Sequence, residues 1–342
     1  MIHFQDINDH AQQLGIDDIK VTHTEPFIIE LQHFREQQLA GLFTNRRHRH
    51  FAKIEKFYDV KSVLANARSV ITACEYYYTD EDDDLSEPGN PCGRIARYTW
   101  RNYYRDLRHR LEKLAEYIHS KNAHSYVVHS NGPVAEKPLA QRSGLGYYGK
   151  HSILIHPVYG SWVVLGEIIT DLDLDPDRPL SMDCRDCRAC IDACPTQAIK
   201  EPYIIDRTRC IQELTNWCGP IPEDIMEVWS TRLYGCTTCQ DACPQNRSAK
   251  PVKPRTSIGQ VGSCIPLFEV LNSDETAYRK HYPDNQITAS WINFTAIQRN
   301  ALIALGHTGD TTAFPYLEKF SHAPDQILSR AAQWSLSRMH NA

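Results

Sequence analysis

Two cysteine-rich runs in the second half of the chain have the residue type and the spacing of metal ligands. The first reads C-x2-C-x2-C-x3-C-P and begins at Cys184, and the second reads C-x2-C-x3-C-P and begins at Cys236. Cys210 stands between them, which makes eight thiols, enough for two 4Fe-4S clusters with four ligands each. Because such clusters pass electrons one at a time, another part of the chain must use those electrons.

The spacing also divides the ligands between the clusters. In two-cluster ferredoxins the cysteine before the proline of such a run ligates the other cluster. We therefore expect one set, Cys184, Cys187, Cys190 and Cys243, and a second set, Cys194, Cys210, Cys236 and Cys239. Zinc is the main alternative, but it explains one set of four cysteines and not two Cys-Pro runs. Disulfides would need an oxidising compartment, which nothing in the sequence indicates.

Four of the twelve cysteines lie outside this spacing. Cys74 stands in an apolar run and is expected to be a small buried hydrophobe. Cys92 and Cys264 have no assigned role, and Cys218 is surplus to the eight ligands.

The composition is that of an ordinary globular protein, with 42% hydrophobic and 23% charged residues in 342. A net charge of −5 gives no overall attraction to nucleic acid, so any such binding needs a local basic face. The start does not read as a signal peptide, and no apolar run is long enough to span a bilayer. We therefore expect a cytoplasmic monomer that binds metal and has no membrane partner.

The elements that would position this chemistry suggest three parts. An α/β domain is expected over residues 1–178, a ferredoxin-like domain over 179–250, and a helical domain over 258–342. The first part shows helical patterns over 1–15, 30–57 and 103–120, and strand patterns over 18–21, 69–74, 152–156 and 162–170. In the last part, Arg299–Leu305 resembles Arg330–Leu336, 31 residues later, which favours stacked HEAT-like hairpins.

Three further stretches leave alternatives open. The basic residues over 46–56 and 94–110 suit either solvated helix faces or contact with nucleic acid, the latter stretch having interleaved aromatic residues. The glycine-rich loop Gly144–Lys150 matches no nucleotide-binding motif. Its glycines suit either a tight hairpin or a close approach of the backbone to a ligand.

The chain resembles a known family, the cobalamin-dependent epoxyqueuosine reductases of tRNA modification. The resemblance covers nearly the whole length and is specific because many motifs occur in the same linear order. Besides the eight cysteines, the matching segments are Leu64–Ile71, Arg97–Trp100, Gly132–Lys137, Gly144–Lys150, Gly166–Thr170, Leu233–Gln240 and Arg299–Leu302.

This resemblance implies a cobalamin-binding α/β domain like that of reductive dehalogenases, a ferredoxin-like domain against the corrin, and HEAT-like helices that help to hold the anticodon stem-loop of tRNA. It also implies the reaction, in which the epoxide of epoxyqueuosine at the wobble base becomes the alkene of queuosine. Two electrons from an external low-potential donor are consumed, and one oxygen leaves as water. Clusters deliver the electrons, cobalt handles the C–O bond, and a protein acid protonates the oxygen.

Site residues follow from the same resemblance. Trp100, Gly146, Lys150 and Ser152 are expected near the cobalamin, with a plain hairpin role as the alternative for Gly146 and Lys150.

The chain departs from the family where the substrate should lie. The family's proton-donating Asp is replaced by Ser130, whose hydroxyl is a far weaker acid. His129, Tyr103 and Tyr104 are alternative candidates for the proton donor. The segment after Trp100 is one residue shorter and lacks the family's Asp and His.

Because these changes cluster while the cysteines remain complete, two alternatives to the family activity stay open. One keeps the cofactors but acts on another epoxide, an organohalide or another small molecule. The other is an electron-transfer or corrinoid-reducing protein without activity on tRNA.

Overall fold

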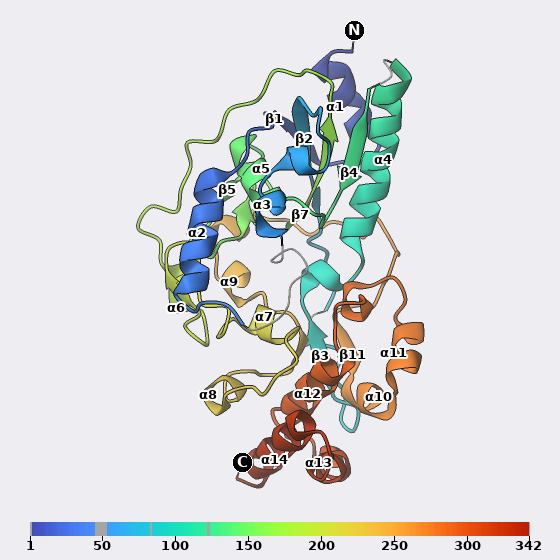
Figure 1. The fold of residues 1–342 in the computed structure, drawn as a ribbon. Coiled ribbons are helices and arrows are strands. Elements are labelled where there is room, and N and C mark those ends of the chain that lie inside the picture. Colours follow the sequence, from blue (N-terminus) through green and yellow to red (C-terminus); the bar gives the residue numbers. More distant parts are fainter. Residues whose placement is uncertain (1, 45–52, 83, 122–123, 342) are drawn as a thin grey trace.

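The computed structural model describes residues 2–44, 53–82, 84–121 and 124–341. The predicted basic run Arg46–His50 lies outside these residues. An α/β lobe occupies one end of the molecule, the C-terminal helices occupy the other, and the cysteine-rich region lies at one side between them (Figure 1).

The α/β lobe is built on a four-stranded sheet in the order β1-β2-β7-β4, with every neighbouring pair antiparallel. The strands are β1 (Asp18–Thr22), β2 (Ser69–Tyr76), β4 (Tyr126–His129) and β7 (Val163–Thr170). All eight residues of β2 are buried, as are seven of the eight in β7. These apolar, β-branched runs are central strands covered on both faces, which confirms the two strongest strand predictions.

Helices cover both faces of this sheet. On one face lie α1 (Phe4–Gln13) and α4 (Tyr103–Lys121), and on the other lies α5 (Glu136–Arg142). Gly166 of β7 lets α4 approach, because a Cβ there would lie 2.7 Å from Leu111 and 3.2 Å from Leu107. Since side chains alternate along a strand, Glu167 faces the opposite side, toward α5.

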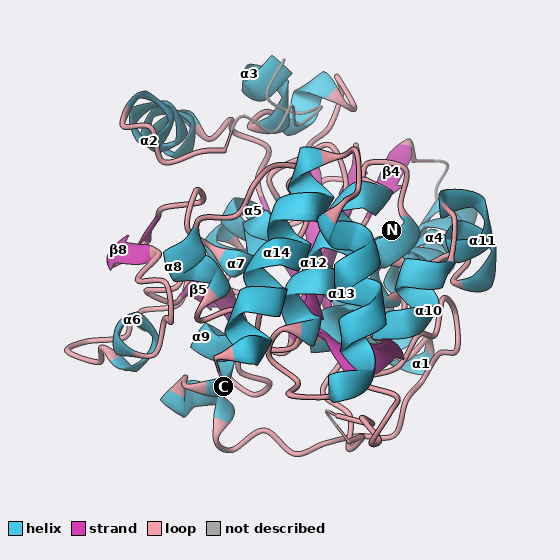
Figure 2. Ribbon diagram, turned by 90° about the horizontal axis from the view of Figure 1, so that it is seen from below, coloured by secondary structure: helices cyan, strands magenta, loops and turns pink. Residues whose placement is uncertain are grey.

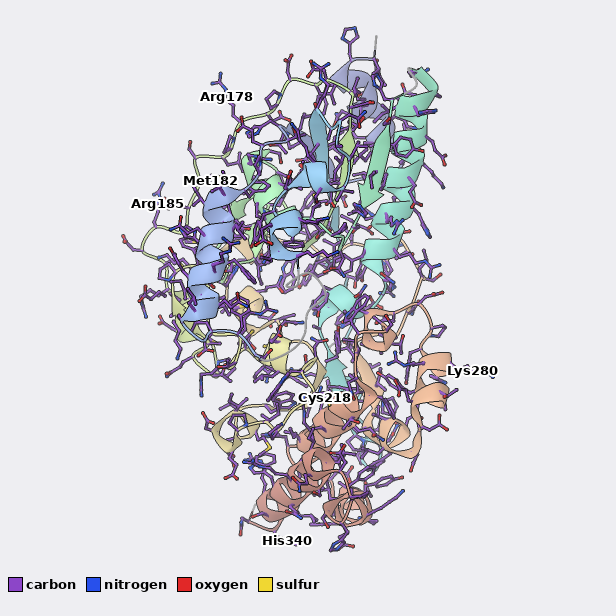
Figure 3. All side chains as sticks on the ribbon, viewed as in Figure 1. Arg178, Met182, Arg185, Cys218, Lys280 and His340 are labelled. Atoms are coloured by element: carbon purple, nitrogen blue, oxygen red, sulfur yellow. The ribbon has the colours of Figure 1, made fainter. Side chains whose placement is uncertain are left out.

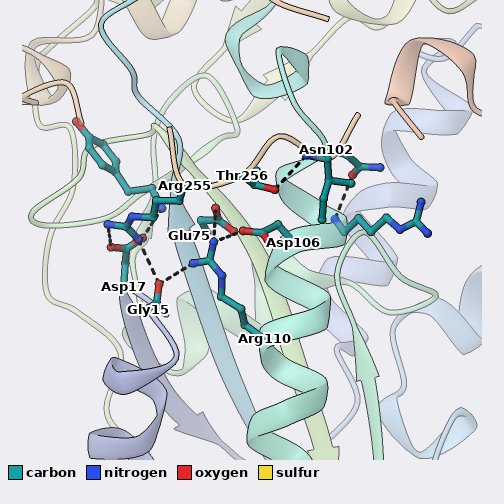
Figure 4. A network of polar contacts seen from close by, with 11 residues as sticks. Gly15, Asp17, Glu75, Asn102, Asp106, Arg110, Arg255 and Thr256 are labelled. Atoms are coloured by element: carbon teal, nitrogen blue, oxygen red, sulfur yellow. Dashed lines mark hydrogen bonds and ion pairs between the residues drawn. The ribbon is translucent and has the colours of Figure 1, made fainter. Parts of the chain in front are cut away.

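A network of charged groups fixes the N-terminal half of α4 against this sheet (Figure 4). Arg110 donates to the Gly15 carbonyl and to the carboxylates of Glu75 and Asp106. Arg255, from the segment after the cysteines, forms a bidentate pair with Asp17 at 2.8 Å. Burial raises the pKa of Glu75 to about 8 although Arg110 opposes the shift. The network therefore ties the chain after the cysteines to the α/β lobe.

A second, three-stranded sheet joins all three predicted parts of the chain. Its order is β10-β3-β11, with β3 (Cys92–Ile95), β10 (Arg232–Tyr234) and β11 (Cys264–Pro266). β10 pairs parallel and β11 antiparallel with β3. One hydrophobic core includes Ile95 and Trp100 as well as apolar residues of the cysteine-rich region and the C-terminal helices. The predicted parts therefore share packing and do not form independent bodies.

The cysteine-rich region contains only short elements. They are α6 (Ala189–Asp192), β8 (Ile199–Glu201), β9 (Ile204–Ile205), α7 (Ile211–Leu214), α8 (Glu223–Met226) and α9 (Thr238–Asp241). The helices α6 and α9, one from each cysteine run, pack against each other. The linker before this region runs along the outer edge of the molecule, where Arg178, Met182 and Arg185 are labelled (Figure 3).

The C-terminal region is helical, as predicted. It contains α10 (Leu267–Asn272), α11 (Glu275–His281), α12 (Phe294–Leu305), α13 (Phe314–Ser321) and α14 (Gln326–His340). From below, α12, α13 and α14 lie side by side in front of the rest of the molecule (Figure 2). The two matching sequence segments fall in α12 and α14, but their arginines differ, because Arg299 is 1% exposed whereas Arg330 lies at the surface and pairs with Glu223. The HEAT-like repeat remains a prediction.

Several predicted elements differ from the structure. The helix expected over 30–57 is α2 (Ile28–Leu39) and α3 (Ile54–Phe57) in the described residues. The strand expected over 152–156 is limited to β6 (Leu154–Ile155), which pairs with β5 (Tyr147–Tyr148) in a hairpin. The strands β3 and β4 were not predicted, because each is four residues long and gains its pairing only from distant strands. In the part of the chain that the structure describes, no helix is both long and apolar enough to cross a membrane.

Candidate functional site

The first predicted set of thiols is brought together around the end of α6. Burial raises the pKa of Cys190 to about 11, and the next contributions come from the charges of Cys184, Cys243 and Cys187. Cys243 belongs to the second cysteine run, so the fold crosses the two runs as the spacing predicts. Because the charges of Cys184, Cys243 and Cys187 all act on Cys190, the four sulfurs are neighbours in a poorly solvated site.

The second predicted set is likewise gathered in space. Burial raises the pKa of Cys239 well above its usual range, followed by contributions from Cys236 and Cys210 and smaller ones from Cys190 and Cys194. Cys190 belongs to the first set, so the two sets are neighbours. Among the described residues, no three His, Cys, Asp or Glu side chains converge as the ligands of a single metal ion would.

Neighbouring donors point at the sulfurs of the second set. The backbone N–H of Ala198 donates to Cys194 Sγ at 3.3 Å, and the hydroxyls of Thr196 and Thr238 lie 3.8 and 3.4 Å from Cys194 Sγ and Cys236 Sγ. Hydrogen bonds to ligating sulfur stabilise its negative charge and raise the potential of a cluster. These contacts suit thiolate ligands.

Two buried amides attach the cysteine-rich region to the α/β lobe. Gln240 Nε2 donates to the Ser161 carbonyl at 2.9 Å, and Asn246 Nδ2 donates to Ser161 Oγ at 2.9 Å. The Ser161 N–H donates in turn to Asn246 Oδ1 at 2.7 Å. Since Ser161 lies two residues before β7, the cysteines are held in a fixed relation to the central sheet.

Three of the residues expected near cobalamin lie in the β5–β6 hairpin, beside the first cysteine run. Lys150 Nζ donates to the carbonyls of Cys187, at 2.9 Å, and Arg185, and Ser152 Oγ donates to the Tyr203 carbonyl at 2.9 Å. Gly146 permits close packing of the hairpin, because a Cβ there would lie 2.7 Å from the Ile155 carbonyl oxygen.

Trp100 lies apart from this hairpin. Its side chain is 1% exposed, its Nε1 donates to the Ile95 carbonyl at 2.8 Å, and the Arg97 guanidinium lies 4.4 Å from the ring centroid. A side chain so enclosed by protein has almost no surface left for a bound ligand, so we do not place Trp100 at the cofactor.

Near the hairpin, several side chains are accessible and yet poorly solvated. Lys137 is exposed, but desolvation lowers the pKa of its ammonium group, which donates to the Ser152 carbonyl at 2.9 Å. Tyr148 is half-buried, and desolvation raises its pKa above the usual range. A group with both properties is surrounded by protein on most sides although solvent can reach it. Such partly enclosed surroundings suit contact with a bound cofactor.

An open cavity of about 470 Å³ lies between α4, the end of β4 and the segment before α12. It is lined by Asn102, Tyr104, Arg105, Arg108, His109, Glu112, Ser130, Asn131, Gln286 and Trp291. Two of the predicted catalytic residues, Tyr104 and Ser130, therefore line one cavity. Arginine and exposed tryptophan side chains accompany them.

Ser130 and His129 are poor proton donors in this setting. Ser130 Oγ donates its hydrogen to the Leu165 carbonyl at 2.6 Å. Desolvation, followed by the charge of Arg108, lowers the pKa of His129 to about 4. The imidazole is therefore neutral near pH 7 and carries no acidic proton of imidazolium type.

The two predicted tyrosines point to different places. Tyr103 is 2% exposed and packs in the core beside Tyr77, with ring centroids 5.6 Å apart. Tyr104 lines the cavity, and desolvation raises its pKa well above the usual range. The structure thus removes Tyr103 from the cavity and leaves Tyr104 there as a very weak acid.

Sequence reasoning missed two neighbouring carboxyl groups on the side of the central sheet that carries α5. Glu136 starts α5 and accepts a hydrogen bond from the Gly132 N–H at 3.2 Å. Glu167 is 1% exposed, its Oε1 has no hydrogen-bond partner, and burial followed by the charge of Glu136 raises its pKa well above the usual range. The sequence signal was present, since a Glu in the apolar run of β7 must be buried or functional.

The other cysteines lie away from the eight predicted ligands. Cys74 is fully buried in β2, as expected. Cys92 and Cys264 are neighbours on β3 and β11, and burial followed by hydrogen bonding to Cys264 raises the pKa of Cys92 to about 12. Cys218 is exposed beside the C-terminal helices (Figure 3).

Two family models match the chain. One, described as epoxyqueuosine reductase QueG, DUF1730, matches residues 58–130. The other, described as a 4Fe-4S double cluster binding domain, matches residues 183–246 and so spans all eight predicted ligands. An epoxyqueuosine reductase of Staphylococcus aureus is 32% identical over 353 residues, which cover 98% of this chain and 88% of that protein.

Solved structures give the same result for the fold. A crystal structure of an epoxyqueuosine reductase with a tRNA-Tyr epoxyqueuosine-modified tRNA stem loop is similar with a TM-score of 0.88 at 28% identity, covering 98% of this chain and 90% of that chain. An epoxyqueuosine reductase from Streptococcus thermophilus is similar with a TM-score of 0.89 at 26% identity, covering 100% and 91%.

Proposed function

The chain belongs to the epoxyqueuosine reductase family, and on this basis we propose that it reduces the epoxide of epoxyqueuosine in tRNA to the alkene of queuosine. The observation that carries the proposal is the similarity over the whole chain, from the α/β lobe through the double-cluster region to the C-terminal helices. The enzyme is an oxidoreductase with two 4Fe-4S clusters.

We propose that each set of four neighbouring cysteines binds one cluster. This division is supported by the electrostatic grouping of Cys190 with Cys184, Cys187 and Cys243, and of Cys239 with the second set. An external low-potential donor would supply the electrons singly.

We propose cobalamin as the second cofactor, beside the β5–β6 hairpin and near Lys137, Tyr148, Lys150 and Ser152. The desolvation of accessible side chains there supports a site that a large group fills. When bound, cobalamin supplies a cobalt centre suited to difficult C–O bond chemistry, which the amino-acid side chains do not provide.

We propose that the anticodon loop enters the 470 Å³ cavity. Arg105 and Arg108 suit contact with phosphate, and Trp291, 47% exposed, suits stacking on a base. The acidic partners of these arginines, Asp284 and Glu112, would have to yield to phosphate. Binding is therefore expected to weaken with salt.

We also propose the division of the chain into three domains, over residues 1–178, 179–250 and 258–342, with HEAT-like packing of the helices in the last. We further propose that the enzyme is a monomer in the cytoplasm. The shared second sheet and core support cooperative folding of these divisions.

The decisive experiment uses the full chain, reconstituted anaerobically with iron, sulfide and cobalamin. With titanium(III) citrate and an epoxyqueuosine-containing anticodon stem-loop, queuosine should form and be detected by mass spectrometry of the nucleosides. Intact clusters and cobalt reduction without queuosine would contradict the proposal.

A second candidate keeps the cofactors and changes the substrate to another epoxide or an organohalide. The observation that favours it is Ser130 at the position of the family's proton donor, with its hydrogen committed to Leu165. A panel of small epoxides and halides, assayed with the same protein, would distinguish it from an electron carrier without turnover.

A further inference from the structure

A small cavity beside the second cysteine run is lined mainly by cationic side chains. Its volume is about 80 Å³, and residues of β3, of β10 and of the segment that begins at Gly235 line it. Its charged residues are three arginines, Arg94, Arg97 and Arg232, and one carboxylate, Asp241. The space is larger than the about 10 to 15 Å³ that a single water molecule needs. The cavity therefore suits a small anion.

Two of the arginines are paired across neighbouring strands. Arg232 of β10 stands opposite Arg94 of β3 in the parallel register of the second sheet. Because side chains alternate between the two faces of a sheet, paired residues project from the same face. Like charges at such positions repel each other. A negative group bound between the two side chains would turn this repulsion into attraction.

The protein holds these two arginines without neutralising them. Arg94 is half-buried, its Nη2 donates to Ser230 Oγ at 3.3 Å, and its Nε has no partner among the described residues. Arg232 donates to the Trp229 carbonyl at 2.6 Å and to Thr238 Oγ1 at 2.9 Å. None of these acceptors carries a charge. A guanidinium group held in this way keeps its affinity for the oxygens of a phosphate group, which it can bind through two parallel hydrogen bonds.

We propose that this cavity is a binding site for a phosphate group, which Arg94 and Arg232 hold. The phosphate comes from the backbone of an RNA or is free in solution, and the chemistry of recognition is the same for both. The proposal goes beyond the reduction of epoxyqueuosine and does not depend on it, since the cavity shares no lining residue with the larger cavity at α4.

The site is connected to the second set of cysteines. Thr238 Oγ1, which accepts from Arg232, lies 3.4 Å from Cys236 Sγ. A phosphate in the cavity and an electron added to the cluster at Cys236 would repel each other at such short range. Reduction of that cluster should therefore weaken phosphate binding, and phosphate should by reciprocity lower the reduction potential of the cluster.

The first test measures the binding of inorganic phosphate to the reconstituted holoenzyme by calorimetry at constant ionic strength. Arg94→Gln removes the charge and should lower the affinity by about tenfold or more. Asp241→Asn removes the carboxylate of the cavity and should raise the affinity by about threefold, a gain that damage to the fold would not produce. Arg178→Gln, at the outer edge of the molecule (Figure 3), makes a matched change and should bind as the wild type does. An iron content of about eight per chain in every variant checks that the clusters are intact.

The second test separates the two sources of phosphate with an unmodified anticodon stem-loop. If the RNA backbone supplies the phosphate, Arg94→Gln should weaken stem-loop binding and reduce the slope of log affinity against log salt by about 1. Equal stem-loop binding, with the binding of inorganic phosphate lost in the variant, would assign the site to free phosphate. If wild type and Arg94→Gln bind neither probe differently, the arginines only balance the charge of the cluster, and the proposal is overturned.

A third readout locates the phosphate at the cluster. Saturation with the probe that binds should lower the midpoint potential of the second cluster by about 59 mV, which corresponds to about tenfold weaker binding after reduction. Redox titration followed by electron paramagnetic resonance measures this, and the shift should be absent from Arg94→Gln. No shift in the wild type, or the same shift in both proteins, would overturn the proposal. Queuosine formation by a protein that fails all three tests would reject this site and leave the proposed function intact.

Discussion

The cysteine-rich region and the surroundings of the cavity differ in how far their buried polar groups are hydrogen-bonded. In the former, Gln240 and Asn246 exchange hydrogen bonds with Ser161, and donors face the sulfurs of Cys194 and Cys236. At the cavity wall, by contrast, His129 Nε2 and Glu167 Oε1 are buried without a partner in the described structure.

This difference reflects two kinds of chemistry. Electron transfer needs ligands held at fixed positions, and complete hydrogen bonding provides that rigidity. Proton transfer needs a group whose two protonation states are close in free energy, and incomplete pairing with burial provides that balance. The two regions are therefore expected to respond differently to substitution.

The largest effect is expected in the cysteine-rich region. Cys239→Ala removes a predicted ligand of the second set and should abolish turnover and lower the iron content from about eight to about four per chain. Iron analysis and the visible spectrum of the anaerobic protein measure this. Cys218→Ala, at an exposed cysteine, should keep about eight irons, and retention of all iron in Cys239→Ala would refute the ligand assignment.

The next effect concerns the support of that region by α12. Arg299 is 1% exposed and donates to the carbonyls of Leu214, Trp217 and Gly219 at 2.6 to 2.7 Å. Arg299→Leu leaves these acceptors unpaired and should cost about 3 kcal/mol, measured by urea unfolding. Its counterpart in the weak sequence repeat, the exposed Arg330, is a matched control, and Arg330→Leu should cost less than about 0.5 kcal/mol. Equal losses would mean that the buried hydrogen bonds are not the cause.

Near the cavity, lowering the pH should reduce the free energy of unfolding through the buried imidazole of His129. The pKa of His129 is lowered from 6.5 to about 4 in the folded state, so the unfolded chain binds more protons between these values. Folding stability is then fully present above about pH 6.5 and falls as the pH drops toward 4. His129→Gln should remove about 1 to 2 kcal/mol of the loss between pH 7 and pH 5, measured by urea unfolding at both values. His322→Gln, at an exposed site, should leave the wild-type loss unchanged, and an unaltered loss in His129→Gln would contradict the buried neutral state.

The smallest effect is expected at Ser130. Because its hydroxyl is bonded to the Leu165 carbonyl, Ser130→Ala should lower the free energy of unfolding by about 1 kcal/mol and change single-turnover reduction by less than about threefold. The same urea and stem-loop assays provide the measurements. A loss of 100-fold in rate would show that Ser130 itself moves the proton.

Some elements could be predicted from sequence because the evidence for them is local. The eight cysteines, the central strands 69–76 and 163–170 and the helical character of the C-terminal region all follow from spacing and apolar patterns. The strands β3 and β4 could not, since four residues carry little pattern and their pairing depends on distant segments. The same holds for Trp100, which the family resemblance placed near the cobalamin and whose side chain the core encloses.

The sequence by itself determined that this chain binds two 4Fe-4S clusters and belongs with the epoxyqueuosine reductases, because ligand type and spacing are properties of consecutive residues. Only the tertiary structure decided how burial shifts the acidity of the groups in and around the cavity. Acidity depends on burial and on neighbours from other elements, and Glu136 and Glu167 meet only because α5 packs on the face of β7.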